Sequence, residues 1–130
     1  MIRANEANFE THLRYGQTLL LASQAASGTR SAYYQHARAE DLRLAKPEGI
    51  DATMGQHKLD AIFMPMYWGA QIGAKAGYPT ITVPAGYDAN GQPVGISLLG
   101  LAYSEGKLIQ YGYAFEQATK ARKSPPLEVI

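Results

Sequence analysis

Apolar residues recur at helical spacing in the first part of the chain. Between about residues 5 and 26, apolar side chains recur at spacings compatible with a helix, which predicts one helix that Gly16 weakens in its middle. Gly28 then supplies the glycine that commonly follows a helix C-terminus. The pattern therefore predicts one N-terminal helix and a short connection after it.

A second stretch of helical spacing runs from about residue 30 to residue 45. Residues 46–49 contain Pro47, and proline disfavours helical backbone in the residue before it. We therefore expect the second helix to stop at this tetrapeptide. A short helical turn over residues 51–57 is predicted next, with Asp51 as its N-terminal cap.

The pattern changes near residue 59. The apolar run at residues 61–64 ends at Pro65 and is typical of a short, fully buried strand. Residues 67–79 are rich in glycine, which indicates an irregular loop.

Two further strands are predicted to pair as a hairpin. Every position of residues 80–83 is β-branched, and the run ends at Pro84. Residues 88–91 (DANG) are a turn signal, and residues 94–99 are the expected return strand.

Ser104 and Glu105 open a last predicted helix, because a cap residue is followed by an acid near the positive helix end. Residues 124–126 (SPP) end it. Its expected inner face consists of Leu108, Tyr111, Gly112, Phe115 and Ala118, and its C-terminal basic residues are Lys120, Arg122 and Lys123. The order of elements predicts an α/β fold in one segment over residues 1–130: N-terminal helices, a small mixed sheet containing a β-hairpin, and a C-terminal helix.

Composition narrows the class of protein. Hydrophobic residues make up 46% of the chain and charged residues 18%, which is typical of an ordered globular protein. The 12 basic and 11 acidic residues leave a formal charge of +1, so nothing favours a nucleic-acid partner or an anionic membrane. There is no cysteine and no apolar stretch of signal or membrane-spanning type. We therefore expect a soluble, cytoplasmic protein.

A search for catalytic or metal-binding groups finds little. Ser97 sits between Gly95 and Leu99, whereas a nucleophile elbow needs a glycine two residues on either side of the serine, so Ser97 is interpreted as an ordinary strand residue. The three histidines are far apart and lack the close spacing of helical metal sites: His12, His36 and His57. Neither a metal nor a cofactor is implied.

One set of motifs is more specific. Residues 76–86 (AGYPTITVPAG), followed by residues 91–96 (GQPVGI), closely resemble the C-terminal region of the amidase signature family. Shorter segments agree in order and spacing: residues 15–17 (YGQ), 49–51 (GID), 59–61 (LDA) with Pro65, and 113–119 (YAFEQAT). The resemblance extends from about residue 5 to residue 122 and implies that the fold is a fragment of the amidase signature fold.

The resemblance implies hydrolysis of carboxylic amides by a serine nucleophile, a second serine held by a cis peptide, and a lysine base. Covalent catalysis requires these groups within hydrogen-bond reach of one another. The chain contains no adjacent pair of serines and no Gly-Ser-Ser-Gly, so no catalytic residue can be carried over to it. By resemblance, the catalytic part of the enzyme is missing.

The resemblance also points to a contribution to the substrate pocket. In the family, the loop after the Leu-Asp-Ala strand lies near the bound substrate, which here implies Met66, Tyr67 and Trp68 as substrate-binding residues. Aromatic residues in a glycine-rich loop suit contact with a ligand. They equally suit packing against the sheet, and the sequence leaves both possibilities open.

Two functions of different classes follow. In the first, the chain is a C-terminal amidase segment that is inactive alone. It contributes scaffold and part of the substrate pocket to the complete enzyme, and a small-molecule amide binds only in that complete enzyme. In the second, it is a stand-alone, non-catalytic module that oligomerises. Strands separated from their neighbours leave open edges and apolar faces that must be covered. We therefore expect either a homo-oligomer or a missing N-terminal amidase segment as partner.

Overall fold

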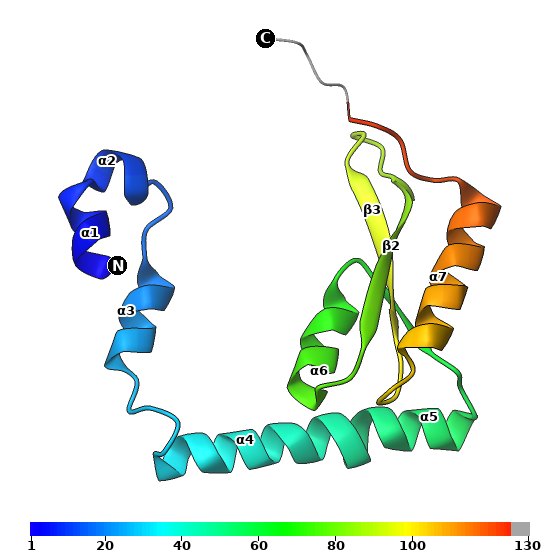
Figure 1. The fold of residues 1–130 in the computed structure, drawn as a ribbon, viewed down its shortest axis with the longest axis horizontal. Coiled ribbons are helices and arrows are strands. Elements are labelled where there is room, and N and C mark those ends of the chain that lie inside the picture. The colour runs from blue at the N-terminus through cyan, green and yellow to red at the C-terminus, as the bar shows by residue number, and fades with distance from the viewer. Residues whose placement is uncertain (126–130) are drawn as a thin grey trace. The chain divides into compact units, whose positions relative to one another are not determined.

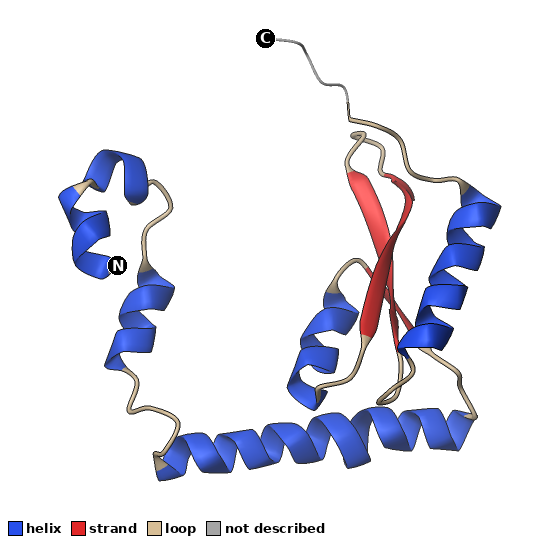
Figure 2. Ribbon diagram, in the orientation of Figure 1, coloured by secondary structure: helices blue, strands red, loops and turns tan. Residues whose placement is uncertain are grey.

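The computed structural model describes residues 1–125 and divides into two units, Met1–Ala37 and Arg38–Ile130. Pro126, the last residue of the predicted helix-ending tripeptide, lies outside the described residues. The strands are confined to the second unit, as the colouring in Figure 2 shows for the described chain.

The first unit consists of short helices with no core of its own. Its helices are α1 (Ile2–Ala7), α2 (Phe9–His12) and α3 (Thr18–Ala25), and it also contains the start of α4 (Ala32–Ala45). The predicted single helix over residues 5–26 is therefore wrong. Gly16 adopts a left-handed conformation with a φ of 73°, and the Asn8 side chain donates to the Ala4 carbonyl oxygen, which offers the backbone an alternative to continuing the helix. No residue of Met1–Ala37 is buried.

The second predicted helix is confirmed as α4, which ends as an α-helix at Ala45, but the predicted break in helical structure at residues 46–49 is wrong. Helix α4 continues through a π-helical turn, η1 (Lys46–Ile50), directly into α5 (Asp51–His57). Proline has no N–H to donate and its ring crowds the carbonyl four residues before it, and the wider π turn accommodates both effects. Glycine is required at Gly49, because a Cβ atom there would clash with the carbonyl oxygen of Leu44. The predicted helical turn at residues 51–57 is confirmed as α5.

Asp51 does not cap that helix. Helix α5 has no side-chain hydrogen bond at its N-terminus, since η1 leads straight into it. The Asp51 carboxylate instead accepts a hydrogen bond from the Tyr78 hydroxyl at 2.8 Å. This bond raises the pKa of Tyr78 above its ordinary value, with desolvation and the Asp51 charge adding to the effect.

The sheet has three strands, β1 (Ile62–Pro65), β2 (Thr80–Tyr87) and β3 (Pro93–Leu99), in the order β1-β3-β2. Both pairings are antiparallel, whereas the sequence predicts a mixed sheet. The expectation of a fully buried first strand is wrong as well. Strand β1 lies at one edge and alternates in burial, with Phe63 61% exposed, because the sheet gives it a neighbour on one side only.

The predicted hairpin of β2 and β3 is confirmed. The Asp88 carboxylate accepts hydrogen bonds from the backbone N–H groups of Asn90 and Gln92, both at 2.8 Å, which forms the predicted turn. Strand β2 does not end at Pro84. It passes through an irregularity in register between Pro84 and Gly86 and continues to Tyr87.

The segment predicted as an irregular loop forms a helix, α6 (Trp68–Ala76), which ends at Gly77 in a left-handed conformation. Its buried residues are Gly69, Gly73 and Ala76. A Cβ atom at Gly73 would lie 2.5 Å from the Thr80 hydroxyl oxygen and 3.0 Å from Leu99. The glycines therefore allow close packing of a helix on the sheet, which outweighs their low helix propensity.

The last predicted helix is confirmed as α7 (Glu105–Thr119), but it ends at Lys120, which is left-handed, and not at residues 124–126 as predicted. The Ser104 hydroxyl donates to the Leu101 carbonyl oxygen and does not cap the helix. Of its predicted inner face, Leu108 and Gly112 are buried, and Ala118 is exposed. Helix α7 packs at Gly112 against Ile81 and Val83, whereas α6 packs against alternate residues of the same strand pair. The two helices thus cover opposite faces of the hairpin (Figure 1).

The core of the second unit lies where α6, the sheet and the α4–α5 stretch meet. It contains Ala45, Ile50, Met54, Ala76 and Leu99. Leu99 is fully buried at the end of β3, and Ile62, Met64 and Tyr78 pack around this cluster. The sheet thereby links the core to the segment that follows β1.

Candidate functional site

The predicted substrate-binding residues lie together at the junction between β1 and α6. Pro65 ends β1, Met66 turns the chain with a φ of 53°, and Tyr67 precedes the first helical residue, Trp68. Left-handed backbone is unfavourable for a residue with a side chain, so this turn must be held by its surroundings.

Two hydrogen bonds hold Met66. Its backbone N–H donates to the Gly95 carbonyl oxygen at 2.8 Å, and its carbonyl oxygen accepts a hydrogen bond from the Ser97 hydroxyl. Both partners belong to β3, the central strand of the sheet. The junction is therefore fixed to the central strand of the sheet by two hydrogen bonds.

The side chains at this junction are open to solvent. Met66 is 38% exposed, Tyr67 59% and Trp68 61%. Gly69 follows immediately and faces the sheet, where a Cβ atom would lie 3.2 Å from that of Ser97. Because α6 presents its glycine side inward, the two aromatic residues are left available for contact with another molecule or chain segment.

Sequence reasoning placed Ser97 in a strand, and β3 confirms this. Ser97 is fully buried, and its hydroxyl oxygen lies 2.9 Å from that of Thr82 in addition to its bond with Met66. The contact with Met66 was missed, and the sequence carries no signal for it, because the register between β1 and β3 joins residues more than thirty positions apart.

The histidines do not form a site. His12, His36 and His57 lie on α2, α4 and α5, and all three are exposed. Within residues 1–125, no group of three or more histidine, aspartate or glutamate residues is placed to hold a metal ion.

A separate apolar cavity of about 510 Å³ opens beside the core of the second unit. Its walls include Leu44, Ile50, Ile62, Met64, Ile72 and Leu99. Asp41 and Lys75, which form an ion pair between α4 and α6, also line it. A hollow with apolar walls next to a core is suited to receive apolar side chains or an apolar ligand.

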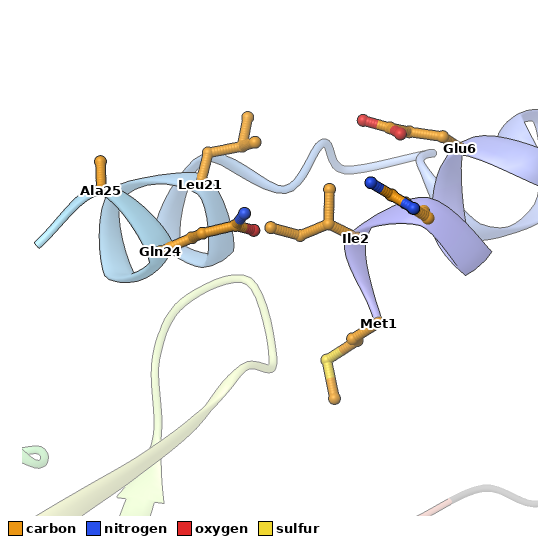
Figure 3. A pocket seen from close by; sticks show the side chains of 7 residues that line it. Met1, Ile2, Glu6, Leu21, Gln24 and Ala25 are labelled. Atoms are coloured by element: carbon orange, nitrogen blue, oxygen red, sulfur yellow. The ribbon is translucent and has the colours of Figure 1, made fainter.

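The first unit has an open hollow of about 660 Å³, between side chains of α1 and α3. Figure 3 shows Ile2 of α1 and Gln24 of α3 pointing toward one another across it, with Leu21 nearby. No residue that lines it is buried, so it lacks the desolvated groups that a specific ligand site requires.

Comparison with known proteins decides the family. The chain is 40% identical over 111 residues to a probable amidase of Arabidopsis thaliana, a match that covers 85% of this chain and 21% of the relative. It is 33% identical over 120 residues to a putative amidase of Schizosaccharomyces pombe, again covering 85% of this chain and 21% of the relative. The structure of the native peptide amidase from Stenotrophomonas maltophilia matches with a TM-score of 0.82 and 41% identity over 95% of this chain and 28% of that chain.

The chain belongs to the amidase signature family. The predicted resemblance and the predicted fold, a fragment of the amidase signature fold, are confirmed. No protein-family model matches the chain. The amidase-like chain spans about a fifth of the length of the curated relatives it matches, 21% in each of the two described. Among residues 1–125, no helix combines the length and apolar character needed to span a membrane.

Proposed function

We propose that this chain is the C-terminal segment of an amidase-type hydrolase that acts on carboxylic amide C–N bonds. It contributes scaffold and part of the substrate pocket and is inactive by itself. The observation that carries this proposal is the match to a peptide amidase, which covers 95% of this chain but only 28% of that chain at 41% identity. We propose a cytoplasmic location, which the absence of cysteine supports.

Met66, Tyr67 and Trp68 form the proposed pocket contribution. The exposure of Tyr67 and Trp68, 59% and 61%, favours contact outside the chain over packing against its own sheet. Aromatic side chains provide large apolar contact at low conformational cost, and loops attached to a rigid sheet are common positions for binding residues.

The proposed partner is the complementary amidase segment that carries the catalytic serines and lysine. The apolar cavity beside Leu99 and the uncovered helices of the first unit are surfaces that such a segment would bury. The small-molecule amide would then be bound only in the completed enzyme.

The alternative is a stand-alone, non-catalytic module that oligomerises. The observation that favours it is the large number of exposed apolar side chains in the first unit, including Tyr15 at 89% and Leu19 at 83% exposure. A second copy of the chain would cover these side chains just as an amidase segment would. Sedimentation of the purified chain separates the two: a concentration-dependent homo-oligomer that does not dissociate when the complementary segment is added supports the module.

The proposed function is tested with a chimera in which this chain replaces the matching segment of the Stenotrophomonas maltophilia peptide amidase. We expect the chimera to hydrolyse an amide substrate and the isolated chain to show none above buffer. Trp68→Ala in the chimera should raise KM, whereas Tyr103→Ala, at a position 96% exposed in a different turn, should not. A folded but inactive chimera, or turnover by the isolated chain that survives repurification, would contradict the proposal.

A further inference from the structure

Ser97 is the most deeply buried polar residue of the second unit among those described, with no exposed surface. It lies on the face of β3 that α6 covers, opposite Thr82 of β2 and Met64 of β1. A buried hydroxyl is costly unless its hydrogen bonds are satisfied, so the partners of Ser97 define what it does.

The direction of each hydrogen bond follows from the number of protons. A serine hydroxyl has one proton, and the Met66 carbonyl oxygen can only accept, so the Ser97 proton is donated to Met66. The Thr82 hydroxyl, 2.9 Å from that of Ser97, must then be the donor in their contact. A chain of two hydrogen bonds thus runs from β2 through β3 to the residue before Tyr67.

Met66 is a residue that needs such support. Its φ of 53° lies in the left-handed region, which a methionine adopts only when its surroundings compensate. The Ser97 bond holds its carbonyl group, and the bond to the Gly95 carbonyl oxygen holds its N–H. The direction in which the chain leaves this turn determines where Tyr67 and Trp68 point.

We propose that Ser97 is a positioning residue for the Met66–Trp68 surface: its buried hydroxyl fixes the turn at Met66 and so orients Tyr67 and Trp68 toward the apolar part of an amide substrate. Ser97 acts through the backbone of Met66 and does not itself touch substrate. The substrate half of this inference rests on the proposed function, whereas the positioning half is a property of the chain alone.

Trp68 is the one tryptophan in the sequence, so the fluorescence of the full chain reports on this turn without a label. Time-resolved anisotropy of Trp68 is measured in the unaltered chain and in three variants. Ser97→Ala removes the donor, and Ser97→Cys keeps a side chain of similar size with a weak donor. Thr82→Val is the matched control, because it removes the second hydrogen bond and leaves the one to Met66.

We expect Ser97→Ala to increase the fast, nanosecond component of depolarisation. Loss of one hydrogen bond raises the ratio of chains with a mobile Met66 turn to chains with a fixed one by roughly fivefold to tenfold. The fast component of Ser97→Cys should lie between those of Ser97→Ala and the unaltered chain, and that of Thr82→Val should match the unaltered chain. Far-ultraviolet circular dichroism establishes that each variant keeps its helices. Unchanged anisotropy in both Ser97 variants, or an equal increase in Thr82→Val, would overturn the proposal.

The chimera separates this inference from the function on which it rests. There, Ser97→Ala should raise KM severalfold with little change in kcat, because the turn contributes binding and no reacting group. An inactive chimera together with the expected anisotropy changes would contradict the proposed function alone. An active chimera in which Ser97→Ala alters neither KM nor anisotropy would contradict the positioning role alone.

Discussion

Both units of the chain contain helices with large apolar side chains, but only the second unit buries any of them. The helices of Met1–Ala37 carry large apolar residues such as Phe9, Leu19 and Tyr33, yet none of them is buried. In the second unit, Leu99 and Leu108 are 0% and 2% exposed. The difference lies in what each helix can pack against, because only the second unit contains a sheet.

Helical periodicity therefore predicts an apolar face but not the element that covers it. In the second unit, the hairpin of β2 and β3 presents one face to α6 and the other to α7. In the first unit, one side-chain hydrogen bond, from Asn5 to Gln17 at 3.1 Å, links α1 to the residue before α3. Most of the stability of a helix comes from packing of its apolar face, so the first unit should be the weaker one.

Amide hydrogen exchange of the unaltered chain gives the largest expected contrast. Amides of α3 should open with a free energy near zero, whereas those of β3 should approach the global value of about 5–15 kcal/mol. The measurement is exchange followed by mass spectrometry, peptide by peptide. Protection of α3 equal to that of β3 would mean that the first unit is covered, as it would be in an oligomer, and repeating the measurement at low concentration distinguishes that case.

Truncation of matched leucines sharpens the comparison. Leu99→Ala should lower the free energy of unfolding by about 2–5 kcal/mol, because it removes fully buried methyl groups and leaves a cavity. Leu19→Ala, at a position 83% exposed, should change it by less than about 0.5 kcal/mol. Both are measured by urea unfolding. A large effect of Leu19→Ala would show that the surface of α3 is buried in solution.

A pair of glycine substitutions tests the close packing of α6. Gly73→Ala should cost about 1–3 kcal/mol, because the new methyl group would lie 2.5 Å from the Thr80 hydroxyl oxygen. Gly55→Ala in α5 meets no atom within 4 Å and should stabilise the chain by about 0.5–1 kcal/mol through helix propensity. Thermal unfolding gives both values. A stabilised Gly73→Ala variant would mean that α6 does not pack as described.

Alkaline pH provides the smallest effect and again concerns the second unit. The hydrogen bond to Asp51 raises the pKa of Tyr78 above its ordinary value of 10.0, so the folded chain holds this proton more tightly than the unfolded chain. The stabilisation is complete below pH 10.0 and is lost as the pH rises through the folded pKa. In Tyr78→Phe, the free energy of unfolding should lack this part of its decrease at alkaline pH. The measurement is urea unfolding at a series of pH values on both sides of pH 10.0. Identical alkaline profiles for the two chains would contradict the assignment.

The hairpin and α7 could be predicted because their signals are local. The β-branched run at residues 80–83, the Asp88 turn and the apolar spacing of α7 each act within a few residues. Helix α6 could not be predicted, because the glycines that lower its propensity are those that let it approach Thr80 and Leu99. That benefit depends on residues brought close only by the fold.

The candidate site shows the same limit. The resemblance to amidases pointed to Met66, Tyr67 and Trp68, and the structure places them together on an exposed turn. Their support by Ser97 could not be foreseen, because it depends on the register of β1 against β3. Their role in binding substrate stays a prediction.

The π turn at Lys46–Ile50 has a consequence for how related chains can vary in length. A π turn holds one residue more than an α-helical turn, and each residue rotates a helix by about 100°. Deleting a single residue here would turn the π turn into a regular α-helical turn, which takes up the loss and keeps Met54 facing Leu99. Chains of this kind should therefore lose one residue within this stretch more readily than within α4 or α5, where one deleted residue would rotate the helix beyond it by about 100°.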